Sequence, residues 1–72
     1  MGSMAALLTL TIDGEALQVE PGRTLAQVLS DRPVPAGFVV LVNGRRIPRA
    51  DHSTTPLQNH DEIQVIQPIA GG

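Results

Sequence analysis

Two dipeptides constrain the fold of this 72-residue chain more than any other feature: Asp13-Gly14 and Asn43-Gly44. Asp-Gly and Asn-Gly pairs readily adopt the positive φ angles that a two-residue hairpin turn requires. Apolar and polar residues alternate on both sides of the first pair, over residues 7–20, and an apolar run at residues 38–42 precedes the second. The sequence therefore predicts two β-hairpins. Because the run at 38–42 does not alternate, its strand is covered on both faces or lies in the middle of a sheet.

The segment between the two hairpins changes to a helical period. Thr24 followed by Gln27 has the form of a capping box, which marks the start of a helix. Prolines at positions 33 and 35 end it. Its apolar residues form one stripe at helical spacing: Leu25, Val28 and Leu29. A short helix with a single apolar face must lie across a sheet.

The remaining residues complete the pattern. Residues 50–61 are polar and loop-like, with Leu57 as the one expected core anchor, and alternation returns over residues 62–69. The order hairpin, helix, hairpin, loop and strand predicts an α+β protein with the ubiquitin-like β-grasp fold. We expect a mixed sheet of four to five strands with one helix across it, and the last strand beside the first.

The chain is long enough for one small domain. We expect residues 4–69 to form it, residues 70–72 to be a flexible tail ending in Gly-Gly, and residues 1–3 to be an expression remnant. A composition of 42% hydrophobic and 17% charged residues is typical of a globular protein. A domain of this size buries only about 60% of its unfolded surface, which leaves little interior for an enzymatic pocket.

Composition also excludes several classes of function. Cysteine is absent, so there is no disulfide, thiolate nucleophile or cysteine metal site. A net charge of −2 and a single aromatic residue, Phe38, argue against nucleic-acid binding. No apolar run approaches the roughly 20 residues that cross a bilayer. We therefore expect a monomeric cytoplasmic protein with no nucleic-acid or membrane partner.

Polar residues do not form a catalytic or metal-binding pattern. His52 and His60 are the two imidazoles, and His60 with its acidic neighbours Asp61 and Glu62 is too compact for a usual zinc geometry. Asp13, like these carboxylates, falls in a turn or at a strand start, where Asp is favoured for backbone reasons. We expect no catalytic residue, no metal ligand and no bound cofactor.

Three strings carry a family resemblance: "VNGRRIPR" (42–49), "TPLQNHDEIQVI" (55–66) and the terminal "AGG" (70–72). Together with the β-grasp order, they resemble the ThiS branch of the ThiS/MoaD sulfur carriers of thiamine-thiazole biosynthesis and related pathways. One departure concerns the turn before the last strand. The family usually has Asp-Gly-Asp there, and this chain has Asn59-His60-Asp61, so only the outer positions keep the polar turn character.

The resemblance implies a protein cosubstrate rather than an enzyme. A ThiF/MoeB-like adenylyltransferase of the ubiquitin-activating type would use ATP to adenylate the Gly72 carboxylate. Sulfur would then replace AMP to give a thiocarboxylate for an acceptor such as a ThiG-like thiazole synthase. Gly71 and Ala70 would thread the narrow channel to the nucleotide, because an extended chain without bulky side chains fits it.

Candidate partner contacts lie near the tail. Apolar residues expected on the outer sheet face suit a docking patch, with ordinary sheet packing as the alternative: Ile66, Ile69, Phe38 and Val40. Arg45, Arg46 and Arg49 form the one charge cluster, which is either a solvated hairpin edge or a patch that steers association with an acidic groove on the activating enzyme.

Other functions remain open at this stage. A ubiquitin-like or TGS-like interaction module would use the same fold without chemistry at its terminus, and a conjugation module would attach Gly72 to other proteins. Carriers of the same design also deliver sulfur for molybdopterin, cysteine, thiolated tRNA or secondary metabolites. The terminal Gly71-Gly72 pair favours the carrier, because an interaction module does not need it.

Overall fold

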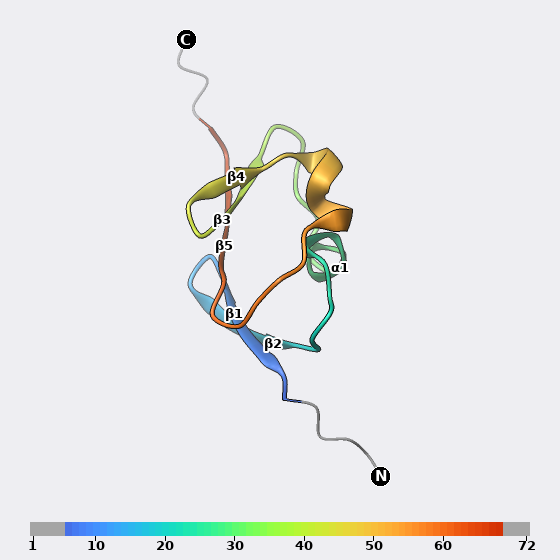
Figure 1. Ribbon diagram of the computed structural model, residues 1–72. Helices are drawn as coiled ribbons and strands as arrows, with labels where there is room; N and C mark the ends of the chain where they lie inside the picture. The colour runs from blue at the N-terminus through green and yellow to red at the C-terminus, as the bar shows by residue number, and fades with distance from the viewer. Residues whose placement is uncertain (1–5, 69–72) are drawn as a thin grey trace.

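The structure is a computed structural model that describes residues 6–68. One five-stranded sheet has the strand order β2-β1-β5-β3-β4 (Figure 1). β1 is antiparallel to β2 and parallel to β5, and β3 is antiparallel to both β5 and β4. The elements in chain order are β1 (Leu8–Ile12), β2 (Glu15–Val19), α1 (Leu25–Leu29), β3 (Val39–Val42), β4 (Arg45–Ile47), the 3-10 helix η1 (Arg49–Thr54) and β5 (Glu62–Ile66).

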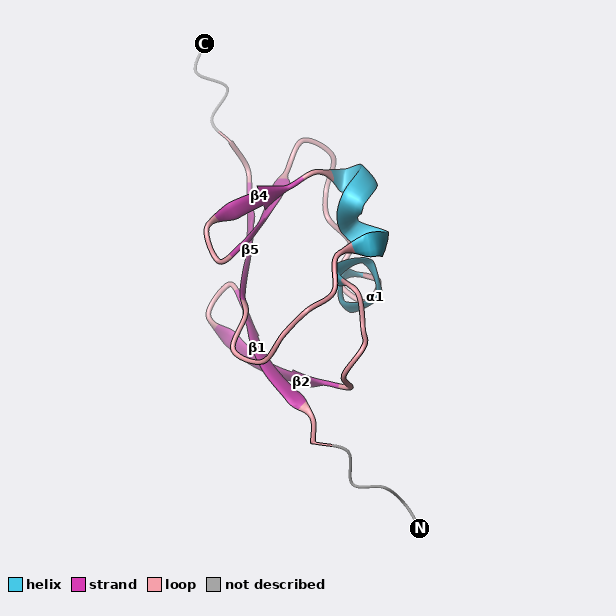
Figure 2. Cartoon of the chain, viewed as in Figure 1, coloured by secondary structure: helices cyan, strands magenta, loops and turns pink. Residues whose placement is uncertain are grey.

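This architecture confirms the predicted mixed sheet, with a helix across it and the last strand beside the first. Figure 2 shows α1 and η1 on the same side of the sheet. The domain boundaries predicted at residues 4 and 69 lie outside the described residues.

Both hairpin turns have the predicted geometry. Asp13 and Gly14 have φ angles of 50° and 88°, and Asn43 and Gly44 have 54° and 82°. The flanking residues pair directly, Ile12 with Glu15 and Val42 with Arg45, so each loop contains two residues. Positive φ at both central positions gives the twist that suits a tight hairpin.

The hydrophobic core fills the space between the sheet and the helices. α1 contributes the whole predicted stripe, and its capping box is formed: Gln27 donates its backbone N–H to Thr24 Oγ1, and Thr24 donates its own to Gln27 Oε1. The predicted anchor Leu57 is also buried. The buried side chains are Leu10, Ile12, Leu25, Val28, Leu29, Val40, Leu57 and Ile63.

The connection between β4 and β5 differs from the predicted loop, because residues 49–54 form η1. This short helix buries none of its residues, so its sequence carries no apolar stripe that would have indicated it. It packs beside α1, and the segment after it is tied to the helix start, where Leu25 donates its backbone N–H to the Thr55 carbonyl at 2.9 Å.

Candidate functional site

The candidate site is the end of the chain, and β5 leads to it. This strand lies between β1 and β3 and leaves the sheet at Ile66, at the end of the molecule where β4 lies (Figure 1). Pro68 is the last described residue. The expected tail, residues 70–72, and the expected docking residue Ile69 lie outside the described part of the chain.

Side chains from both hairpin turns hold β5. Asp13 accepts the Val65 backbone N–H on Oδ1 at 3.0 Å and donates its own backbone N–H to the Ile63 carbonyl at 2.9 Å. Asn43 exchanges two bonds with Glu62: its N–H donates to the Glu62 carbonyl at 2.7 Å, and its Oδ1 accepts the Glu62 N–H at 2.9 Å. The strand that carries the tail is therefore fixed near both ends by bonds from outside its own ladder.

The central residue of the turn before β5 has a left-handed backbone conformation although it is not a glycine. His60 has a φ of 71°, a conformation that His adopts more readily than most residues. Its backbone N–H donates to the Thr9 carbonyl at 2.7 Å, and Thr9 donates its N–H to Asn59 Oδ1 at 2.8 Å. The departure from Asp-Gly-Asp therefore preserves the backbone shape expected of glycine at its centre.

The outer face of the sheet carries an apolar patch beside the tail exit. Directly paired residues point to the same face of a sheet, and Val39 pairs with Ile66. Leu41 lies two residues after Val39 and shares its face. Ile66 is 40% exposed, and the other two side chains are half-buried. We call Val39, Leu41 and Ile66 the outer patch.

The prediction that Val40 belongs to the docking surface is wrong. Val40 is 1% exposed and packs in the core, because alternation places it on the opposite face from Val39 and Leu41. Phe38 is half-buried and lines a hollow that also contains Pro68, so it lies near the tail exit. The sequence reasoning missed Val39 and Leu41, although alternation through the apolar run together with pairing to Ile66 would have identified them.

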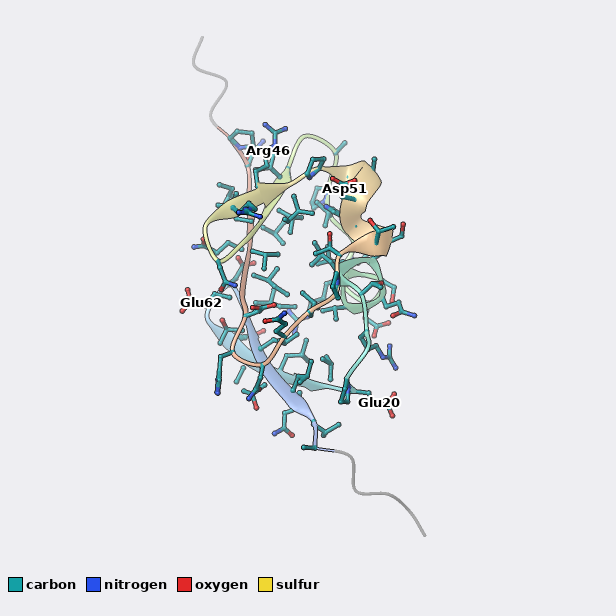
Figure 3. All side chains as sticks on the ribbon, in the orientation of Figure 1. Glu20, Arg46, Asp51 and Glu62 are labelled. Atoms are coloured by element: carbon teal, nitrogen blue, oxygen red, sulfur yellow. The ribbon has the colours of Figure 1, made fainter. Side chains whose placement is uncertain are left out.

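Arg45 and Arg46 are exposed and form no ion pair with any described residue. Figure 3 shows Arg46 at the end of the molecule where β5 leaves the sheet and Glu20 at the opposite end. Whether the arginines contact a partner stays a prediction.

Polar groups in residues 6–68 do not assemble into a reactive centre. No group of three or more His, Cys, Asp or Glu side chains in this range could hold a metal ion. His52 is half-buried, with Nε2 3.1 Å from the Ile47 carbonyl oxygen. The described part of the chain also contains no helix of the length and hydropathy needed to cross a bilayer.

A mixed five-stranded sheet crossed by one short helix, with its central strand running out toward the C-terminus, defines a β-grasp domain. The model of the ThiS family matches residues 5–72, so the chain belongs to the ThiS family, and the prediction of a small sulfur carrier is confirmed. Among curated proteins, none matches the chain closely.

Among solved structures, the thiamine biosynthesis protein ThiS from Geobacter metallireducens is similar to this chain. The two align with a TM-score of 0.72 over 90% of this chain and 100% of that protein, at 20% sequence identity. At this identity the similarity supports the β-grasp fold.

Proposed function

We propose that this chain carries sulfur as a thiocarboxylate on Gly72 and delivers it to thiamine-thiazole formation. One observation carries the proposal: the match to the ThiS family includes residues 70–72, the Ala-Gly-Gly sequence. The solved relative is described as a thiamine biosynthesis protein, which favours that pathway over the other sulfur-requiring ones.

The chemistry requires activation, because a carboxylate has no good leaving group. An oxygen of the Gly72 carboxylate attacks the α-phosphorus of ATP and pyrophosphate leaves, so that Gly72 becomes an acyl-adenylate. Sulfide then attacks the acyl carbon and AMP leaves, which gives the thiocarboxylate. If an enzyme persulfide attacks instead, an acyl disulfide forms, and a second thiol must reduce it to release the thiocarboxylate.

In these steps the carrier presents its Gly72 carboxylate to the enzymes and catalyses nothing itself. A ThiF/MoeB-like enzyme binds ATP and performs the activation, and a ThiG-like thiazole synthase accepts the sulfur. Gly71 and Gly72 carry no Cβ, so they fit a channel that excludes bulkier residues. The bonds from Asp13 and Asn43 to β5 give the tail a fixed base.

The outer patch is the surface that we assign to docking on the activating enzyme. It is apolar, partly exposed and adjacent to the end of β5, so a partner that covers it also receives the tail. Phe38 lies at the same end, and Ile69 follows Pro68 in sequence, so both remain in this proposal.

The direct test is ATP–pyrophosphate exchange catalysed by a ThiF/MoeB-like enzyme. The complete chain should support exchange, and deletion of Gly72 should abolish it while leaving the unfolding temperature unchanged. Deletion of Met1 to Ser3 is the matched control at the other terminus and should leave exchange intact. The proposal fails if the complete chain supports no exchange, or if the Gly72 deletion supports it fully.

A further inference from the structure

The five arginines of the chain fall into two groups with different surroundings. Arg23 pairs with Glu20 at 3.7 Å and Arg32 with Glu15 at 3.3 Å, and both arginines line a hollow between β2 and α1. The other three lie within five residues of one another in β4 and η1. None of those three forms an ion pair or a side-chain hydrogen bond with a residue in the 6–68 range: Arg45, Arg46 and Arg49.

Two of these three arginines line the same hollow beside the tail exit. Arg46 and Arg49 line a hollow of about 300 Å³ that also contains Phe38, His52 and Pro68. None of the residues that line this hollow is an Asp or a Glu. Asp51 follows two residues after Arg49 but forms no ion pair with it. The lining of this hollow is therefore cationic, although the whole chain has a net charge of −2.

Arg45 has a different environment. It pairs with Val42 at the β3–β4 turn and lines a separate hollow together with Asp61. Val42 in turn pairs with Ile63, near the start of β5, so Arg45 lies at the end of the sheet away from the tail exit. The hollow that Arg45 lines thus contains an acidic residue, whereas the hollow that Arg46 and Arg49 line contains none.

We propose that Arg46 and Arg49 form an anion-binding site at the base of the tail, which engages carboxylate side chains around the channel of the enzyme that activates Gly72. The inference rests on the proposed function. It keeps the acidic partner surface considered for the arginine cluster and narrows that cluster to two residues, Arg46 and Arg49.

Reach favours protein carboxylates over the phosphates of ATP. Gly72 is the fourth residue after Pro68, and four extended residues span about 13 Å. When the tail is threaded, the reacting carboxylate and the nucleotide lie that far from the hollow at Pro68. The anion that meets Arg46 and Arg49 therefore belongs to the rim of the channel rather than to its interior.

The site acts on association rather than on chemistry. Both side chains are exposed, so their charges act through solvent and fall off with ionic strength. Charges of this kind orient and accelerate the encounter of two proteins, and they change the reaction rate of the bound complex little. Replacing them should lower kcat/KM for the carrier and leave kcat unchanged.

The experiment measures steady-state adenylation of the carrier by a ThiF/MoeB-like enzyme, with carrier and ATP varied separately. Arg46→Glu and Arg49→Glu should each lower kcat/KM for the carrier about tenfold, and the double variant should lower it further. Arg45→Glu makes the same charge change in the same strand and is the control, with an expected loss below about threefold. Raising the salt from about 50 mM to about 500 mM should lower kcat/KM for the unsubstituted carrier by a larger factor than for the double variant.

The outcomes separate this inference from the proposed function. No adenylation of the complete chain contradicts the proposed function. Adenylation that is equally sensitive to Arg45→Glu and to Arg46→Glu, or insensitive to both, overturns the assignment of the site. A rise in KM for ATP instead of the carrier shows that the anion is a phosphate and also overturns it. Unchanged unfolding temperatures establish that the variants are folded.

Discussion

Replacement of Asn43 by Asp tests the bond that joins the β3–β4 turn to Asp61, the residue before β5. Asn43 Nδ2 donates to Asp61 Oδ1 at 2.8 Å, while Asn43 Oδ1 accepts the Glu62 N–H. Asp retains the acceptor and tolerates the positive φ, as Asp13 does in the other turn. The substitution therefore changes one contact: the Nδ2 donor opposite the Asp61 carboxylate is replaced by a second carboxylate oxygen.

The magnitude follows from two contributions. A hydrogen bond to a charged acceptor contributes about 1.5–3 kcal/mol, and solvent exposure at this turn lowers its contribution below that range, to about 1 kcal/mol. Two unit charges 2.8 Å apart repel by about 1.5 kcal/mol even in the dielectric of water, and side-chain rotation relieves part of this. We expect a loss of about 2 kcal/mol in the free energy of unfolding. For a domain of this size, that loss corresponds to a fall of about 10 °C in Tm.

The assay is thermal and urea unfolding followed by circular dichroism at neutral pH. Asn59→Asp is the matched control, because Asn59 uses its side-chain oxygen to accept the Thr9 N–H and Asp retains that oxygen. We expect the control to change Tm by less than about 4 °C, which corresponds to less than about 1 kcal/mol. If Asn43→Asp lowers Tm no more than Asn59→Asp does, the bond from Asn43 Nδ2 to Asp61 does not stabilise the fold in the way described.

Two further predictions concern the helix start and the docking surface. Thr24→Ala removes the acceptor of the capping box and should lower the free energy of unfolding by about 1 kcal/mol. Thr24→Ser keeps the hydroxyl and should retain most of that stability. Equal losses in the two variants would contradict the role of the hydroxyl. Ile66→Ala should weaken binding to a ThiF/MoeB-like enzyme about tenfold in calorimetry, because it truncates the exposed member of the outer patch. Leu7→Ala is its control, since Leu7 is 47% exposed, somewhat more than Ile66, but lines the hollow between β2 and α1; equal weakening by both would refute the assignment of the patch.

Local signals in the sequence were sufficient to predict the elements that depend on them. The Asp-Gly and Asn-Gly turns require positive φ at two residues, and the sequence places residues that tolerate it there. The helix stripe and its capping box are likewise contained within six residues, Thr24 to Leu29. These features involve neighbours in sequence, so they can be predicted without knowing the tertiary structure.

The face that we propose for docking could not be predicted without longer-range information. Residues 38–42 are all apolar, so the sequence does not show which of them face the core. The pairing of Val39 with Ile66 decides this, and it joins positions 27 residues apart, from 39 to 66. The assignment of Val40 to the surface failed for this reason. η1 was missed because it packs beside α1 without a buried stripe of its own.

The side-chain bonds that fix β5 could not be predicted from the sequence either. Asp13 and Asn43 were identified as turn residues, which explains why Asp and Asn are suitable there, but their side chains also bond to β5. His60 similarly shows a backbone conformation that its identity alone does not require. Each of these roles depends on a contact between segments more than ten residues apart in sequence or on the shape of the assembled turn.

The central claim is that Gly72 carries the sulfur, and the mass of the intact protein tests it most directly. The chain is incubated with a ThiF/MoeB-like enzyme, ATP and sulfide, and its mass is recorded before and after. We expect an increase equal to the exchange of one oxygen atom for one sulfur atom, located on the C-terminal fragment and absent without ATP. An unchanged mass after ATP has been consumed and pyrophosphate released, or a sulfur atom located on any other fragment, would contradict it.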